Sequence, residues 1–248
     1  MTDLSRLTIK LFADGADLQG IRALAANPVI QGFTTNPTLM RAAGVEDYAE
    51  FAHRMLAMVG DRPVSFEVFA DDLDEMESQA REIASWGSNV YVKIPVTNTE
   101  GVFTGPLIGQ LAGLGIRVNV TAIMTVAQVE AVAQCLTDAT PAVVSVFAGR
   151  IADTGRDPVP MMADAARVLA GRPKAELLWA SPREVLNIFQ ADAAGCHIIT
   201  ATGDLLGKLG SIGKDLGVFS LETVEMFYRD ARAAGYAIET KAKVTSGE

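Results

Sequence analysis

The chain has 248 residues, and 49% of them are hydrophobic, which suits one large domain with a sizeable core. Its formal net charge of −9 at pH 7 argues against nucleic acids and anionic membranes as partners. No apolar run is long enough to cross a bilayer, the first residues lack the plan of a signal peptide, and the two cysteines form no disulfide framework, so we expect a cytoplasmic protein.

Strand-like and helical patterns alternate along the chain. Strands are predicted over Thr8–Ala13, Gly32–Thr35, Val64–Ala70, Asn89–Pro95, Arg117–Thr121, Ala142–Phe147, Ala175–Ala180 and Cys196–Thr200. Helices are predicted over Asp17–Ala26, Asp47–Val59, Asp72–Trp86, Glu100–Leu114, Val126–Leu136, Pro158–Ala170, Pro182–Ala194 and Leu205–Lys214. Eight strand–helix units in this length predict a TIM (β/α)8 barrel, and a doubly wound sheet is the alternative.

Several predicted helices begin with residues that cap helices. Asp17 and Thr125 each stand directly before a helical pattern. The run Ser181-Pro182-Arg183-Glu184 is typical of a capping box with proline at the first helical position. It predicts a helix whose free N–H groups lie close to Ser181.

The end of the chain lies beyond the eighth unit. A last helix is predicted over about 221–234, and the tail 241–248 is polar. We expect residues 1–248 to form one barrel domain with this helix added. We also expect a homo-oligomer, and the last helix is the only argument for it.

Lys93 is the most informative residue of the sequence. The run Asn89–Thr97 alternates as a strand does, so that valine and isoleucine side chains share one face and Lys93 lies on the other. A buried ammonium is costly, and the neutral amine that desolvation favours is a nucleophile for carbonyl carbons. The alternative is a lysine whose stem is buried while its head reaches water or a carboxylate.

Polar residues recur at the same end of the other predicted strands. They are Asp14, Thr35, Asn36, Glu67, Asn119, Thr121, Ser145, Arg150, Ser181 and Arg183. In a TIM barrel the C-terminal ends of the strands form the active site. The sequence therefore predicts a polar pocket that contains Lys93, and no Cys/His cluster in it has the spacing of metal ligands.

Four motifs carry a family resemblance. They are Phe12-Ala13-Asp14, Thr34-Thr35-Asn36-Pro37, Val92-Lys93-Ile94-Pro95-Val96-Thr97 and Phe147-Ala148-Gly149-Arg150-Ile151. In order and spacing they resemble the transaldolase family, from about residue 8 to about residue 235. The resemblance implies a lysine Schiff base, sugar-phosphate substrates, and neither a metal nor an organic cofactor.

The resemblance also implies roles for single residues. Lys93 would attack the ketose carbonyl, and Asp14 would take the proton from the C4 hydroxyl when the C3–C4 bond breaks. Glu67 and Thr121 would hold a water that relays protons. For Glu67 the alternative role is an ion pair with Lys93.

Further positions would hold the substrate. By the same resemblance, the substrate-binding residues are Thr35, Asn36, Asn119, Ser145, Phe147, Arg150, Ser181 and Arg183. Arg150, Ser181 and Arg183 match the phosphate-binding corner of the family. For Arg183 the alternative is a solvated side chain paired with Asp153 or Asp157.

Glu67 and Phe147 favour one activity within the family. Fructose-6-phosphate aldolases tend to have glutamine and tyrosine at the matching positions, so this pair favours transfer of a dihydroxyacetone unit. A fructose-6-phosphate aldolase-like enzyme stays open, as does a transaldolase for a modified or sulfonated sugar, given Trp179 and Pro182. Two other classes of function also stay open: a non-catalytic barrel that binds sugar phosphates, and a structural oligomeric protein.

Overall fold

The structure is a computed structural model that describes residues 4–239, so the predicted polar tail 241–248 lies outside the described residues. Eight parallel strands close into a barrel in the order of the sequence. The strands are β1 (Lys10–Asp14), β2 (Ile30–Thr34), β3 (Val64–Glu67), β4 (Val90–Pro95), β5 (Val118–Ile123), β6 (Ala142–Val146), β7 (Ala175–Trp179) and β8 (Ile198–Thr202). The predicted TIM barrel is confirmed, and the doubly wound alternative is wrong.

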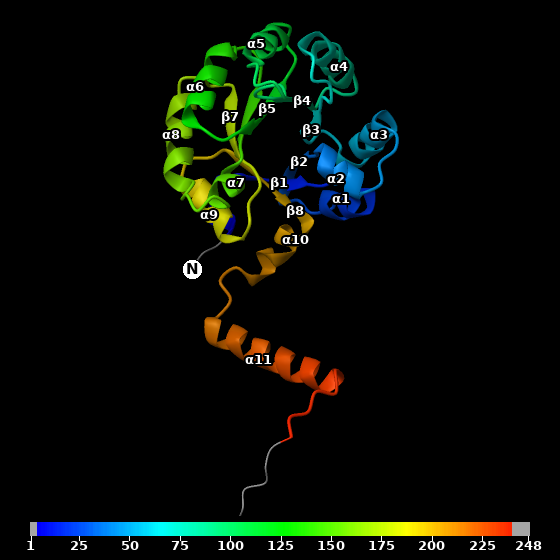
Figure 1. Ribbon diagram of the computed structural model, residues 1–248, viewed down its shortest axis with the longest axis vertical. Helices are drawn as coiled ribbons and strands as arrows, with labels where there is room; N and C mark the ends of the chain where they lie inside the picture. The colour runs from blue at the N-terminus through cyan, green and yellow to red at the C-terminus, as the bar shows by residue number, and fades with distance from the viewer. Residues whose placement is uncertain (1–3, 240–248) are drawn as a thin grey trace, which may run out of the picture. The chain divides into compact units, whose positions relative to one another are not determined.

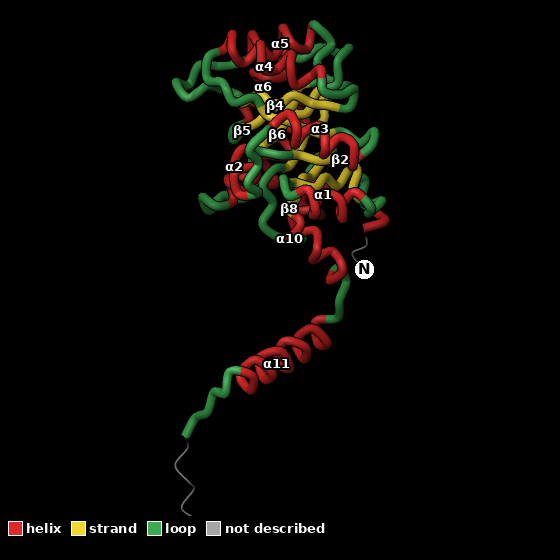
Figure 2. Tube along the Cα trace, turned by 90° about the vertical axis from the view of Figure 1, so that its right-hand side faces the viewer, coloured by secondary structure: helices red, strands yellow, loops and turns green. Residues whose placement is uncertain are grey.

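Helices surround the strands of the barrel (Figure 1), and Figure 2 shows the strands enclosed by helices from a second direction. The α-helices are α1 (Leu18–Ala25), α2 (Pro37–Ala42), α3 (Tyr48–Val59), α4 (Leu73–Ser85), α5 (Gly105–Gly113), α6 (Val126–Cys135), α7 (Ala148–Ala152), α8 (Val159–Leu169), α9 (Leu186–Ala193), α10 (Gly203–Leu206) and α11 (Leu216–Ala233). Short 3-10 turns cover Leu4–Arg6 and Gly207–Ser211. Helices α2 and α7 are additions to the predicted set.

Two predicted caps are confirmed, and one is wrong. Asp17 accepts hydrogen bonds from the N–H groups at the start of α1, and Thr125 forms a capping box with Gln128 at the start of α6. Ser181, in contrast, has a φ of 58°, a left-handed conformation that a residue preceding a helix does not adopt. Helix α9 begins only at Leu186 and has no side-chain cap.

Apolar side chains form two layers on the two sides of the strands. The outward layer packs between strands and helices, and it includes the alternate residues of β4 that the sequence pattern assigns to that face. The inward layer consists of Phe12, Val143, Leu178, Ala180 and Ile198, with Tyr91 and Phe147 against it. Gly32 makes room for the Phe12 ring, since a Cβ at that position would overlap it. Burying a large apolar side chain contributes about 1.5–3 kcal/mol, so both layers stabilise the barrel.

The described chain divides into two compact units. Leu4–Gly210 form the barrel, and residues 211–239 belong to the other unit. Helix α11 begins five residues before the predicted helix, because Asp215 caps it by accepting a hydrogen bond from the Val218 N–H. The single domain over 1–248 stays a prediction. Among the described residues, no helix combines the length and the apolar character that a membrane crossing requires.

Candidate active site

A cavity of about 460 Å³ opens at the C-terminal ends of the strands. Of the predicted site residues, those that line it are Asp14, Asn36, Glu67, Lys93, Asn119, Thr121, Ser145, Phe147, Arg150, Ser181 and Arg183. Thr35 is fully buried and is not part of the wall. The barrel therefore brings the predicted side chains from seven strand ends to one place.

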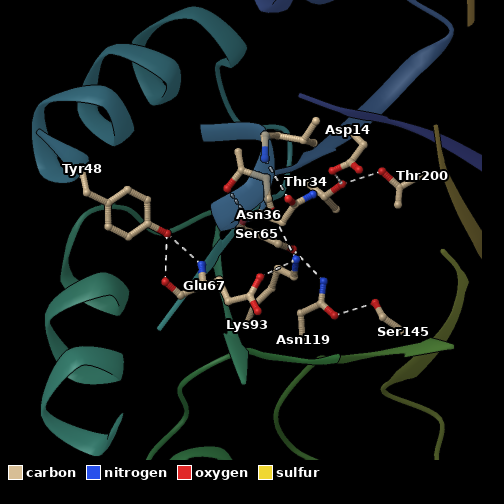
Figure 3. A network of polar contacts seen from close by, with 12 residues as sticks. Asp14, Thr34, Asn36, Tyr48, Ser65, Glu67, Lys93, Asn119, Ser145 and Thr200 are labelled. Carbon is tan, nitrogen blue, oxygen red and sulfur yellow. Dashed lines mark hydrogen bonds and ion pairs between the residues drawn. The ribbon is translucent and has the colours of Figure 1, made fainter. Parts of the chain in front are cut away.

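Lys93 lies against a carboxylate at the end of β4. Its Nζ is 2.9 Å from Glu67 Oε2 and donates a hydrogen bond of 2.8 Å to the carbonyl oxygen of Thr35 (Figure 3). The register of β3 and β4 sets Glu67 directly beside Lys93. Only 6% of Lys93 is exposed, so the ammonium depends on these two partners for its stability. The ion pair that was the alternative role for Glu67 is therefore present.

Asp14 ends β1 and belongs to a chain of hydroxyl groups. Its Oδ1 accepts a hydrogen bond of 2.7 Å from Thr34 Oγ1, and the Thr34 and Thr200 hydroxyls are 2.6 Å apart. Burial raises the pKa of Asp14 above its ordinary value, although Lys93 and the Thr34 hydrogen bond lower it. A carboxylate with a raised pKa is a stronger base, which suits proton transfer.

Asn119 is held from both sides by serine hydroxyls. Its Nδ2 donates to Ser65 Oγ at 2.9 Å, and its Oδ1 accepts from Ser145 Oγ at 2.7 Å. These bonds fix the orientation of the amide at the cavity wall. Asn36 also lines the cavity, and its Oδ1 caps α2 by accepting from the Leu39 N–H.

Thr121 lies beside an irregularity in β5. Its Oγ1 is buried and has no hydrogen-bond partner among residues 4–239. Ala122 follows with a φ of 63°, and the pairing of β5 with β6 shifts between Val120 and Ile123. A buried hydroxyl without a protein partner is a place where a water or a ligand can bind.

The predicted phosphate corner differs from the expectation. Arg183 pairs with Asp153, with Nε 3.0 Å from Oδ1, as its alternative role predicted. Through that hydrogen bond Arg183 lowers the pKa of Asp153. The N–H groups of Arg183 and Glu184 donate to Asn187 Oδ1, so neither is the free helix N-terminus that the sequence predicted.

Arg150 is a second exposed cation of this corner. It belongs to α7, and its guanidinium lies over the Phe147 ring at 5.3 Å from the ring centre. Gly149 next to it has to lack a side chain, since a Cβ there would overlap the carbonyl oxygen of Ser181. The backbones of α7 and of the segment after β7 therefore meet without an intervening side chain.

Sequence reasoning missed several residues of the wall, among them Thr34, Ala122, Leu178, Thr200 and Thr202. Thr34 and Thr200 carried a signal, because each is a polar residue on the inward face of an apolar strand. Trp179 is fully buried in the outward layer and is not part of the wall, so it gives no reason to expect a modified sugar.

The comparisons with known proteins agree with the geometry. The sequence matches the family described as Transaldolase/Fructose-6-phosphate aldolase over residues 11–246. A probable transaldolase 2 of Listeria monocytogenes is 36% identical over 82% of this chain and 89% of its own. A probable transaldolase of Streptococcus agalactiae is 37% identical over 77% of this chain and 85% of its own.

Solved structures agree on the fold alone. A chain assigned as a lyase/mutase from Burkholderia cenocepacia has a TM-score of 0.58 at 16% identity, and the match covers 98% of this chain and 90% of that one. Function is therefore indicated by the family match and the relatives. By these findings, the chain belongs to the transaldolase/fructose-6-phosphate aldolase family and is an enzyme of the transferase or aldolase kind.

Proposed function

We propose that the protein is a transaldolase that moves a dihydroxyacetone unit from a ketose phosphate to an aldose phosphate through a Schiff base on Lys93. The observation that carries the proposal is the buried amine of Lys93 at the wall of an open cavity, with Glu67 Oε2 at 2.9 Å. Glu67 is close enough to receive the proton that the amine loses before it attacks.

In the first step, the Lys93 nitrogen bonds to the ketose carbonyl carbon, and water leaves as the iminium forms. The iminium withdraws electrons, so the C3–C4 bond can break with its electron pair moving into an enamine. Asp14 takes the proton of the C4 hydroxyl, and the aldose phosphate departs. The steps then run in reverse with an acceptor aldose phosphate: the enamine carbon bonds to its aldehyde carbon, Asp14 returns the proton to the new hydroxyl, and water releases the new ketose phosphate from Lys93.

The proton relay needs a water held between Glu67 and Thr121. The unpartnered hydroxyl of Thr121 supports this role, because it offers a donor and an acceptor inside the cavity. Because Glu67 contacts Lys93 directly, the water would form a hydrogen bond to Glu67 without lying between the two side chains. Thr35 contributes through its carbonyl oxygen, which orients the amine.

Transfer is favoured over release of free dihydroxyacetone by Glu67 and Phe147. The Phe147 ring has no hydroxyl with which to protonate the enamine or to bind a water beside it. The enamine would therefore persist until an acceptor arrives. A fructose-6-phosphate aldolase-like activity is the competing outcome, and product analysis separates the two.

The substrate phosphate would bind at Arg150 with the Ser181 hydroxyl. Arg150 is exposed and lines the cavity, while Arg183 is already paired with Asp153. Asn36, Asn119 and Ser145 would bind the hydroxyls of the covalent fragment. A chain with a net charge of −9 does not attract anions from a distance. Cations at this corner would therefore have to bind the phosphate locally.

One experiment tests the proposal as a whole. The protein is incubated with ketose phosphates, with and without an aldose phosphate, and the products are identified by mass. A new ketose phosphate that forms only with the acceptor supports transfer, and free dihydroxyacetone without acceptor supports the aldolase. Absence of any product, together with absence of a borohydride-reduced adduct, would leave a barrel that only binds sugar phosphates.

We also propose a homo-oligomer in which α11 packs against a second copy. Its large apolar side chains are 41% to 79% exposed, and they are Leu216, Val218, Phe219, Leu221, Val224, Met226, Phe227 and Tyr228. An exposed apolar surface of this kind marks an interaction site. Light scattering should report an oligomer that Phe227→Glu dissociates.

Cys135 and Cys196 are free thiols, which fits the predicted cytoplasm.

A further inference from the structure

Tyr48 is a buried phenol that no motif of the sequence identifies. It is the first residue of α3, a helix outside the barrel, and it is not among the residues that line the cavity of Lys93. It lines a neighbouring, mostly apolar cavity together with Phe69, Trp86 and Glu67. Glu67 is thus the residue that borders both cavities, and it separates Tyr48 from the reacting groups.

The Tyr48 hydroxyl makes two hydrogen bonds to the backbone of Glu67. It accepts from the Glu67 N–H at 2.8 Å and donates to the Glu67 carbonyl oxygen at 3.0 Å (Figure 3). Burial raises the pKa of this phenol above its ordinary value, so it keeps the proton that the second bond requires. One side chain therefore satisfies both polar backbone groups of the residue that pairs with Lys93.

These bonds fill a gap in the barrel. The pairing of β2 with β3 ends at Thr34 and Ser65, and the chain then turns into α2. The N–H and C=O of Glu67 point to that side, since the next residue, Val68, donates to Lys93 on the other side. Without Tyr48, both groups of Glu67 would lack a strand partner. The hydroxyl takes the place of the missing residue of β2.

Aromatic packing fixes where the hydroxyl lies. The Tyr48 ring centre is 4.6 Å from that of Phe69, 5.3 Å from that of Trp86 and 6.1 Å from that of Phe66. The contacts with Trp86 and Phe66 are edge-to-face, an arrangement that aromatic pairs prefer. A phenylalanine at position 48 would keep these contacts and lose only the hydroxyl.

We propose that Tyr48 is a positioning residue for the reaction: its hydroxyl fixes the backbone of Glu67 and so holds the Glu67 carboxylate against Lys93 Nζ. The inference rests on the proposed Schiff-base chemistry for its effect on turnover. The geometric part is independent, because Lys93 depends on the placement of Glu67 whether or not a sugar reacts there.

The test is Tyr48→Phe, with Tyr91→Phe as the matched control. Tyr91 lies on the inward face of β4, the strand of Lys93, and packs in the inward apolar layer. Tyr48→Phe should lower kcat by roughly ten- to a hundredfold with little change in KM, since a small misplacement of a reacting group has effects of that size. Tyr91→Phe should keep the parental kcat.

A double-mutant cycle distinguishes positioning from general stabilisation. If Tyr48 acts through the Glu67 carboxylate, adding Tyr48→Phe to Glu67→Gln should change kcat far less than it does in the parental enzyme. An equal loss in both backgrounds would overturn the proposal, as would a parental kcat in Tyr48→Phe. Thermal unfolding confirms that each variant is folded.

A labelling experiment works even if no sugar is turned over. Trace acetic anhydride labels amines, and mass spectrometry compares Lys93 with the exposed Lys174 as an internal reference. Tyr48→Phe should change the relative labelling of Lys93 several-fold, and Tyr91→Phe should not. Unchanged labelling in Tyr48→Phe would contradict the positioning role, whereas an inactive parent with changed labelling would contradict only the proposed function.

Discussion

Two lysine–glutamate pairs lie at opposite ends of the same barrel. Lys93 and Glu67 are 2.9 Å apart at the C-terminal ends of the strands, and their side chains are 8% and 17% exposed. Lys10 and Glu176 are 2.6 Å apart at the N-terminal ends, with side chains 46% and 30% exposed. The pairs have the same chemistry and a similar distance, and they differ in their access to water.

For the proposed chemistry, that difference separates the pair that would react from a surface pair. The exposed pair is screened by water and contributes about 0–1 kcal/mol. The buried pair has lost most of its water, so each group depends on the other and on the cavity wall. The proposed chemistry needs an amine in the wall of an open cavity, where a carbonyl carbon can reach it. Substitutions at both ends test this comparison.

Lys93→Met should have the largest effect. Without the amine no Schiff base forms, and turnover should fall by more than roughly 10⁴-fold, as expected when a nucleophile is removed. The same change at Lys10 should leave turnover near the parental rate. Borohydride with fructose 6-phosphate should leave a reduced adduct on the peptide that contains Lys93. An adduct of equal yield in the Lys93→Met protein would contradict the assignment.

Glu67→Ala should have the second-largest effect on turnover. Loss of a group that relays protons slows turnover by roughly 10²–10⁴-fold. It also leaves the Lys93 ammonium without its carboxylate, so Glu67→Gln is the better-folded companion variant. Glu176→Gln is the control at the other end and should be near parental in activity. Glu67→Gln combined with Phe147→Tyr should shift the products toward free dihydroxyacetone, and an unchanged product ratio would argue against that role.

Arg150→Ala tests an exposed cation at the reactive end. It should remove a charge-assisted contact of roughly 1.5–3 kcal/mol, which is roughly ten- to a hundredfold in the use of a phosphorylated acceptor. The measurement is kcat/KM with phosphorylated and unphosphorylated acceptors, and the control variant is the exposed Arg156→Ala. Equal losses on both acceptors would make Arg150 structural.

Asp14→Asn should change the stability of the fold by a small amount, and the direction of that change is informative. Burial raises the folded-state pKa of Asp14, so the ionised group destabilises the fold above that pKa. The asparagine variant should therefore unfold at a higher temperature than the parent at neutral pH while losing activity. Below about pH 3, where Asp14 is protonated in both the folded and the unfolded state, the difference should vanish. Asp17→Asn, which keeps an N-cap, is the control.

The residues on strands were predictable, because strand periodicity determines which face each side chain occupies. Lys93, Glu67 and Asn119 lie where the alternation of apolar residues assigned them. The residues on loops were harder to place. The run Ser181–Glu184 has the composition of a capping box, but Ser181 has a φ of 58° and its carbonyl lies against Gly149. No local pattern encodes that contact.

Tyr48 shows a second reason for a missed residue. Its partner is the backbone of Glu67, 19 residues further along the chain, and a backbone group leaves no trace in a sequence pattern. The gap in pairing between β2 and β3 follows from the early turn into α2, a helix that the sequence did not predict. The role of Tyr48 becomes visible only when both strands are in place.

The contact between Gly149 and Ser181 has a consequence for redesign. Any side chain introduced at position 149 would overlap the Ser181 carbonyl and displace the backbone beside the proposed phosphate site, so position 149 is a poor choice for altering substrate preference. Arg150 and Pro182 line the cavity beside the same contact. A library that varies these two positions and keeps Gly149 would explore new acceptors without changing the residues of the proposed lysine chemistry.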